Sequence, residues 1–149
     1  MNFHNVEVGE HLEAQLSFSP AQISHFAQLA GDENPIHHDK GAALAAQFAN
    51  VVVSGPQLSS RLMGMTATHF SRPGKDNRER SMLGLDFRFR FRRAAYADSM
   101  LQFTWEVVAV RHKPALRGDL VFLAGRVRDA AGEDAVKAVG KVLVRSALA

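Results

Sequence analysis

The sequence predicts an α+β protein in which one antiparallel sheet packs around a long, buried helix. After one short strand, the first half of the 149-residue chain contains three segments whose apolar residues recur with helical spacing. The second half contains four segments in which apolar and polar residues alternate, as in strands with one buried face. The connections between those strands are too short for crossover helices, so neighbouring strands must be antiparallel. Packing a helix on one face of this sheet is the simplest way to bury both apolar surfaces.

The composition is that of a soluble globular protein, and the length suits a single domain spanning residues 1–149. Hydrophobic residues make up 46% of the chain and charged residues 22%, so no disordered tail is expected. No apolar run approaches the roughly 20 residues needed to cross a bilayer. The first residues also lack the pattern of a secretory signal, so we expect a cytoplasmic protein that does not enter the membrane.

Cysteine is absent, which excludes disulfides, thiol nucleophiles and thiolate metal sites. The seven histidines show no metal-ligand spacing, and no metal site is predicted. The net charge of +3 is compatible with a nucleic acid, an anionic cofactor or neither as a partner.

The first strand and helix have clear boundaries in the sequence. Residues 10–18 alternate between apolar and polar side chains, which predicts a half-buried strand. Ser19 is a good N-cap, Pro20 suits the first helical position, and Gln22 completes a capping box. Gly31 is a favourable residue for ending this helix.

Two further helices follow. Asp39 is a suitable N-cap for the second helix, and its expected buried face consists of Leu44, Ala45 and Phe48. The third helix begins at Ser54-Gly55-Pro56 and is apolar on most faces, with Leu58, Leu62, Met63, Met65 and Thr66 along it. Such a helix is expected to be central and covered by other elements.

The four strands of the second half are expected at residues 82–91, 100–110, 120–127 and 135–145. A sheet of this size with bare edges tends to pair with a second copy of the chain. A homodimer is therefore predicted.

A polar turn lies between the first two helices. Seven of its nine residues, 31–39, are Gly, Pro, Asp, Asn or His. It holds a carboxylate, Asp32, and an imidazole, His37, five positions apart, with Pro35 between them limiting the backbone. Such residues can form a proton-transfer pair, and they also suit an ordinary turn between helices.

The turn resembles the signature of a known family. Its residues Asp32-Glu33-Asn34-Pro35-Ile36-His37-His38-Asp39 are similar to the D-x-N-P-x-H-x-D motif of the MaoC-like (R)-specific enoyl-CoA hydratases. Residues 48–63 resemble the family's F-x-x-x-(I/V)-x-H-G-M-x-x-x-S segment, and residues 84–98 resemble its later G-x-x-x-x-F strand and the turn after it. The resemblance implies a hot-dog fold, usually dimeric. It also implies reversible hydration of a trans-2-enoyl thioester to the (R)-3-hydroxyacyl thioester.

The resemblance also implies roles for individual residues. Asp32 and His37 match the catalytic pair, and Gly55 matches the glycine whose N–H binds the thioester carbonyl. Ser60 matches a serine that helps to hold the pair, with Ser59 directly beside it, and Asn34 and Pro35 match the residues that shape the turn. The resemblance thus implies an oxyanion and substrate-binding site that includes Gly55, Ser60 and Asn34.

The chain departs from the family at two places. Ser54 and Pro56 replace the usual His and Met on either side of Gly55, and the turn before Asp98 lacks its Gly. Pro56 has no N–H, so Gly55 is left as the oxyanion donor at this helix end. These departures bear on the substrate preference.

The chemistry suits these residue types. A carboxylate can act as the base or anchor for the water, and a histidine exchanges a proton near neutral pH. A backbone N–H at a helix N-terminus, as expected for Gly55, can stabilise the developing enolate oxygen. We expect His38 to be a partly exposed neighbour of this pair, and Asp39 to be a helix cap rather than a base.

A run of alternating aromatic and basic residues has several interpretations. Arg88, Arg90 and Arg92 are candidate contacts for the phosphates of coenzyme A, which arginine binds well. They also suit a nucleic-acid surface or a solvated sheet face opposite a Phe-lined core. Strict alternation puts Phe and Arg on opposite faces, which argues against nucleotide bases stacking among the arginines.

The sequence therefore predicts a hydro-lyase acting on an enoyl thioester, with no cofactor other than the coenzyme A of the substrate. The carrier could be coenzyme A or an acyl carrier protein. Two alternatives stay open, an acyl-CoA thioesterase and a non-catalytic acyl-thioester-binding subunit, because a fold does not determine a reaction. No nucleic-acid partner is predicted.

Overall fold

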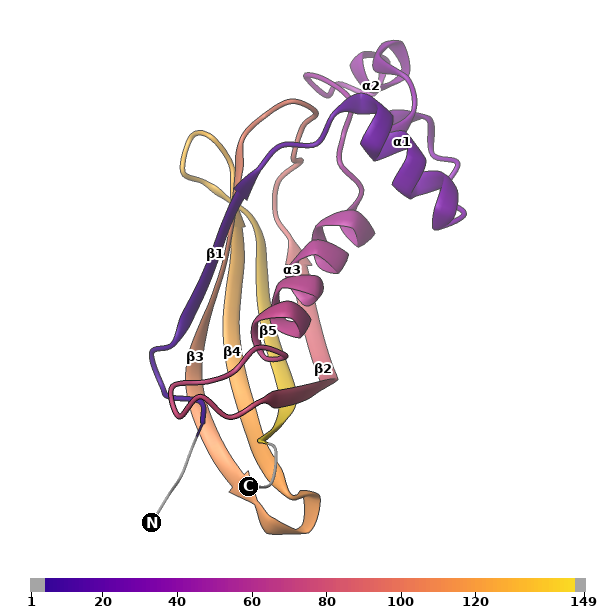
Figure 1. Ribbon diagram of the computed structural model, residues 1–149. Coiled ribbons are helices and arrows are strands. Elements are labelled where there is room, and N and C mark those ends of the chain that lie inside the picture. The colour runs from indigo at the N-terminus through magenta and orange to yellow at the C-terminus, as the bar shows by residue number, and fades with distance from the viewer. Residues whose placement is uncertain (1–4, 147–149) are drawn as a thin grey trace.

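The computed structural model describes residues 5–146 (Figure 1). In chain order its elements are β1 (His11–Leu16), α1 (Pro20–Leu29), η1 (Pro35–His37), α2 (Lys40–Ala45), α3 (Gly55–His69), β2 (Arg80–Phe91), β3 (Leu101–Lys113), η2 (Pro114–Leu116), β4 (Gly118–Arg128) and β5 (Asp134–Ser146). The labels η1 and η2 denote single 3₁₀ turns. The predicted strand, three helices and four strands are therefore all present in the predicted order.

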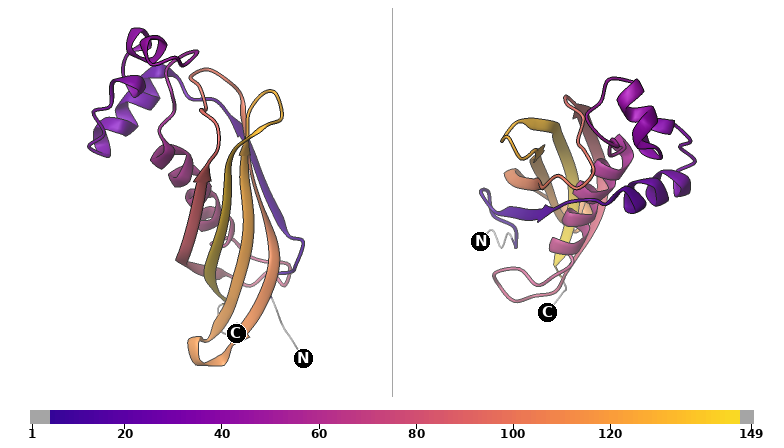
Figure 2. Two further views of the ribbon diagram at one scale, coloured as in Figure 1. Left: turned by 180° about the vertical axis from the view of Figure 1, so that it is seen from behind. Right: turned by 90° about the horizontal axis from the view of Figure 1, so that it is seen from above.

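The five strands form one antiparallel sheet in the order β1-β3-β4-β5-β2. The hairpins β3–β4 and β4–β5 occupy its centre, and β1 and β2 form its two edges. The sheet curves, and α3 crosses its concave face (Figures 1 and 2). This arrangement is the hot-dog fold, and it confirms the predicted α+β class.

The helix α3 is held against the sheet by its apolar side and by one side-chain hydrogen bond. Leu58 and Leu62 are buried against the strands. The indole Nε1 of Trp105 on β3 donates to the carbonyl oxygen of Leu62 at 2.8 Å. Gly125 lies opposite Trp105 in the β3–β4 register, and a Cβ at that position would overlap the indole ring. A glycine there is what allows the large ring to lie flat between sheet and helix.

Two predictions about helix burial are wrong. On α2, Ala43 is buried and Leu44 is 51% exposed, because the six-residue helix packs by only one narrow side. Helix α3 was expected to be covered by other elements on most of its faces. In the described residues one of its faces is open to solvent, since Ser60 and Arg61 are exposed and Met63 is 40% exposed. The sheet covers only one side of α3, and α1 and α2 lie beyond the end of the sheet (Figure 1).

Short backbone contacts hold the segment from α1 to α2 over the first turn of α3. The N–H of Val52 donates to the carbonyl of Ile36 at 3.0 Å, and Val52 also bridges to Tyr96. The N–H of Asp98 donates to the carbonyl of Phe18 at 2.8 Å. These contacts place the polar turn, residues 31–39, beside the N-terminal end of α3.

Within residues 5–146, no helix is long and apolar enough to span a membrane.

Candidate active site

The side chains of Asp32 and His37 meet on the polar turn. Asp32 Oδ2 lies 3.3 Å from His37 Nε2, and the His37 side chain is 9% exposed whereas that of Asp32 is 29% exposed. The carboxylate thus reaches solvent while the imidazole is enclosed. The nine-residue turn thus brings a carboxylate and an imidazole together, and groups of these two types can act in proton transfer.

The other ring nitrogen of His37 determines which atom exchanges a proton. Nδ1 lies 2.6 Å from the carbonyl oxygen of Val52. A carbonyl can only accept, so Nδ1 carries a hydrogen and donates it. The remaining nitrogen, Nε2, faces Asp32, so it is the ring nitrogen left open for proton exchange. Sequence analysis did not identify Val52, because every residue has a backbone carbonyl and the residue type does not show which one accepts a hydrogen bond.

The end of α1 sets the position of Asp32. The N–H of Gly31 donates to the carbonyl of Gln28 at 3.1 Å, and the N–H of Asp32 donates to that of Ala27 at 2.8 Å. This pair of bonds is a Schellman motif, with Gly31 at a φ of +73°. The predicted helix stop at Gly31 is therefore confirmed, and it places Asp32 at the first residue beyond the motif's glycine.

Asn34 shapes the turn, as the sequence predicts. Its N–H donates to Asp32 Oδ1 at 3.0 Å, and its own Oδ1 accepts from the N–H of Ile36 at 3.3 Å, capping η1. The first bond orients the Asp32 carboxylate so that Oδ2 faces His37. Asn34 itself is exposed. A role of Asn34 in substrate binding stays a prediction.

The first turn of α3 leaves one backbone donor free. Ser54 caps the helix by accepting from the N–H of Gln57 at 3.3 Å, and Pro56 has no N–H. The N–H of Gly55 has no earlier turn of helix to bond with. Gly55 follows Val52 by three residues, so the His37–Val52 hydrogen bond ties the Asp32–His37 pair to this helix end. Gly55 also packs against Phe91, whose ring would be 3.0 Å from an added Cβ.

The structure does not place Ser60 beside the pair. Ser60 is exposed, and five residues after Gly55 it lies on a different side of α3. Ser59 lies on the Gly55 side, and its hydroxyl donates to the Gly55 carbonyl at 2.9 Å. Of the two serines, Ser59 is the one that contacts the residue predicted to bind the thioester.

The arginines of β2 lie on the outer face of the sheet. Phe87 packs on Trp105, which faces α3, so the alternating Arg88 and Arg90 point to the opposite face. They line a cavity of about 320 Å³ together with Arg126 and Lys137. Arg92 lies just beyond β2 and is exposed. The predicted separation of Phe and Arg is observed, while the role in phosphate binding stays a prediction.

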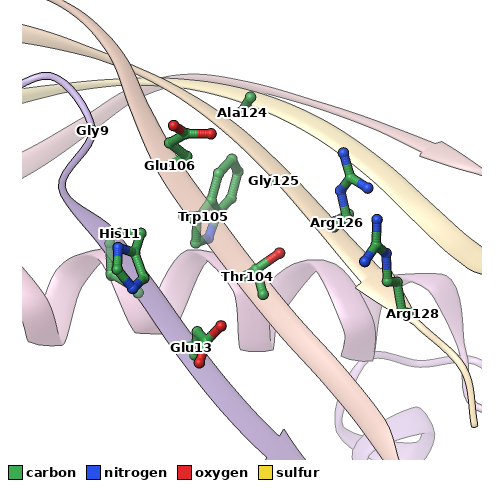
Figure 3. Close-up of a pocket in the computed structure, with 11 residues that line it drawn as sticks. Gly9, His11, Glu13, Thr104, Trp105, Glu106, Ala124, Gly125, Arg126 and Arg128 are labelled. Carbon is green, nitrogen blue, oxygen red and sulfur yellow. The ribbon is translucent and has the colours of Figure 1, made fainter. Parts of the chain in front are cut away.

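A second cavity on the outer face, of about 400 Å³, is shown in Figure 3. Charged side chains from three strands border it, among them Glu13, Glu106 and Arg126. It includes none of the predicted catalytic residues.

His38 makes contacts that sequence analysis did not foresee. Its Nε2 lies 2.8 Å from the carbonyl oxygen of Asp32, and its Nδ1 lies 2.7 Å from the hydroxyl of Ser24 on α1. Asp32 and His38 both line a cavity of about 580 Å³ beside the turn. The lining of this cavity includes neither His37 nor Gly55.

Residues 5–146 contain no group of three or more His, Cys, Asp or Glu side chains that could hold a metal ion.

Comparisons with known proteins identify the family of this chain. Residues 4–117 match the family described as MaoC like domain. An (R)-specific enoyl-CoA hydratase from Aeromonas caviae is 29% identical over 139 residues, covering 92% of this chain and 98% of that protein. A UPF0336 protein from Streptomyces avermitilis is 30% identical over 134 residues, covering 85% of this chain and 83% of that protein.

The solved structures include a hydratase of the same fold. The (R)-hydratase from A. caviae involved in PHA biosynthesis superposes with a TM-score of 0.79 at 26% identity. The superposition covers 92% of this chain and 96% of that one. Because the family match extends over well more than half of the sequence and the folds agree, the chain belongs to the MaoC-like domain family.

Proposed function

We propose that this protein catalyses the reversible, (R)-specific hydration of trans-2-enoyl thioesters to (R)-3-hydroxyacyl thioesters. One observation carries the proposal. A carboxylate and an imidazole, Asp32 and His37, lie 3.3 Å apart on one turn, and a hydrogen bond from His37 to Val52 ties them to the helix end that presents Gly55. The name of the A. caviae relative supports the choice of reaction and its stereochemistry.

The proposed reaction moves two protons with no net gain or loss. In the hydration direction, a water that contacts both Asp32 Oδ2 and His37 Nε2 from the substrate side adds its oxygen to the β-carbon of the enoyl group. One proton of that water passes to the pair, and the pair supplies one proton to the α-carbon. General acid–base groups placed in this way typically contribute about 10²–10⁴ in rate.

The thioester carbonyl becomes an enolate oxygen during the addition, and the free N–H of Gly55 is the proposed donor to it. The positive end of the α3 dipole favours this charge, and the absence of a Cβ lets the carbonyl come close. One such donor is typically worth about 10²–10³ in rate. Coenzyme A, or the arm of an acyl carrier protein, enters only as part of the substrate.

We further propose that the protein is a homodimer. The edge strand β2 is twelve residues long and pairs on one side only, with β5. Leu83 and Phe91 on this strand are 61% and 54% exposed. A long apolar edge of this kind is stabilised by pairing with another strand. Helix α3, on which Met63 is 40% exposed, crosses the concave face of this sheet (Figure 1).

Turnover of a short trans-2-enoyl-CoA by the purified protein tests the reaction. We expect the enoyl absorbance to fall without release of free thiol. Asp32→Asn and His37→Gln should each lower kcat by about 10²-fold or more while the melting temperature changes little, because each removes one proton-transfer group.

Three results would contradict the proposal in different ways. Thiol release without loss of enoyl absorbance would indicate a thioesterase. Calorimetric binding of acyl-CoA without turnover at any chain length would indicate a non-catalytic binding subunit. Full activity in both variants would remove the catalytic roles of Asp32 and His37.

A further inference from the structure

The main chain of Asp32 is held at both of its polar groups. Its N–H donates to the carbonyl of Ala27 in α1 at 2.8 Å, and its carbonyl oxygen lies 2.8 Å from His38 Nε2. We propose that His38, together with Ser24, is a positioning residue that keeps the Asp32 carboxylate beside His37. This inference rests on the proposed function for its effect on rate, and its geometric part can be measured without any turnover.

The two partners of His38 determine its tautomer. The Asp32 carbonyl can only accept, so Nε2 of His38 carries a hydrogen. In a neutral imidazole Nδ1 is then an acceptor, and the Ser24 hydroxyl donates to it across 2.7 Å. Ser24 therefore selects the tautomer that can hold Asp32. If His38 becomes protonated, Nδ1 donates instead, and the hydroxyl can turn to accept, so the contact with Asp32 persists in both states.

The contacts of His38 differ from those of an exposed neighbour. Both ring nitrogens have a partner, one on α1 and one at the start of the turn that contains His38. The ring is only partly buried, because one side borders the 580 Å³ cavity that Asp32 also lines. Glu33 and Asp39 are the other charged groups that line this cavity. His38 thus links α1 to Asp32 by a route separate from the helix-end hydrogen bonds.

These contacts leave the Asp32 side chain little freedom. With the peptide groups on both sides of Asp32 tethered, the direction of its Cα–Cβ bond is fixed. The Asn34 N–H, 3.0 Å from Oδ1, then limits rotation of the carboxylate and directs Oδ2 at His37. Catalytic groups work when they are held within about 0.5 Å of the productive geometry, and a displacement of about 1 Å can cost 10²-fold in rate.

The test compares His38→Leu, which removes both hydrogen bonds, with His38→Gln, which keeps an N–H donor of similar reach. For His38→Leu we expect kcat to fall about 10- to 100-fold while KM for the enoyl thioester stays within about twofold. The Gln variant should recover most of the loss. Ser24→Ala should lower kcat less, and it should add nothing in the His38→Leu background, because both changes break the same chain of contacts.

A second readout does not depend on activity. The ¹⁵N resonance of His37 Nε2 reports the carboxylate beside it, and we expect it to shift in His38→Leu but to stay near its wild-type position in His38→Gln. If the wild-type protein turns over no enoyl thioester, the proposed function fails, and this resonance still decides the positioning role. An unchanged resonance in His38→Leu, equal kcat losses in the Leu and Gln variants, or a loss confined to KM would overturn the inference. Should His38→Leu fail to fold, Ser24→Ala carries the test, and a kcat and a His37 Nε2 resonance equal to those of the wild type in that variant would overturn the inference.

Discussion

Asp32 and Asp39 are chemically identical members of one eight-residue motif, yet they do different work. Asp39 Oδ2 accepts from the N–H of Ala42 at 2.9 Å and caps α2, as the sequence predicts. Asp32 follows the end of α1, and its Oδ2 faces His37 Nε2. The difference arises from position relative to the helix ends, because a carboxylate at an N-cap uses its oxygen on the backbone.

We predict that Asp39→Ser retains at least half of the wild-type kcat, because serine also caps helices and Asp39 does not contact His37. Its melting temperature should change by no more than a few degrees. Steady-state kinetics on enoyl-CoA beside Asp32→Asn provides the measurement, with both proteins checked by circular dichroism. A loss in Asp39→Ser as large as in Asp32→Asn would mean that the second carboxylate takes part in proton transfer.

At the scale of elements, the C-terminal end of α3 is joined to β1 and β2 by a cluster of charged side chains. Glu10, just before β1, accepts from His69 Nε2 at 2.8 Å and lies 3.4 Å from the guanidinium of Arg80. The Arg80 side chain is 2% exposed and also donates to the backbone of Asn5 and His69. This cluster holds the end of α3 opposite to the catalytic turn.

Because of this cluster, the free energy of unfolding should depend on pH in the acid range. Burial, the largest influence, raises the pKa of Glu10, but the hydrogen bond from His69 and the charge of Arg80 together lower it below the ordinary value of 4.5. A carboxyl whose pKa is lower in the folded state stabilises the protein above its unfolded pKa. That stabilisation is lost as the pH falls below about 4.5 toward the folded pKa.

We therefore predict that Glu10→Gln lowers the free energy of unfolding at pH 7 by about 1 kcal/mol. The difference from wild type should shrink as the pH falls below 4.5, where Glu10 itself becomes neutral. Urea unfolding at several pH values between 3 and 7 measures both. The matched control is Glu13→Gln, on an exposed position of β1, which should change neither quantity. Equal pH dependence for wild type and Glu10→Gln would contradict the assignment.

At the scale of the whole molecule, the sheet has two unequal edges. Strand β1 is six residues long, whereas β2 is twice that length and carries exposed apolar side chains. Natural sheets usually protect such an edge by pairing or covering it. The open side of α3 and the edge β2 are thus the surfaces on which a second copy would complete the structure.

We predict that light scattering after size exclusion gives twice the chain mass of 16.3 kDa at micromolar concentration. Leu83→Lys should shift the protein toward the monomer, because a charge on an edge strand opposes strand pairing. Val8→Lys replaces a residue that is 65% exposed near the opposite edge, and it should leave the mass unchanged. A wild-type mass of one chain would remove the homodimer proposal.

The elements and the turn were predictable because their signals are local. The capping box of Ser19 and Gln22, the helix stop at Gly31 and the cap at Asp39 each involve groups within a few residues, and all are present in the structure. The alternation in β2 likewise predicted which side chains face the core. The same signals could not show that α3 has an open side, because its burial depends on how far the sheet reaches around it.

By itself, the sequence determined the order of strands and helices and the position of the polar turn, since short-range spacing and capping dictate these features. The pairing of Asp32 with His37 on that turn was expected only from the resemblance to the family motif. Only the tertiary structure decided that Val52 fixes the hydrogen on Nδ1 of His37, and that Ser24 of α1 holds the ring of His38 whose other nitrogen contacts the Asp32 carbonyl. The physical reason is that hydrogen bonds to backbone carbonyls from distant segments depend on three-dimensional approach, which residue type and spacing do not encode.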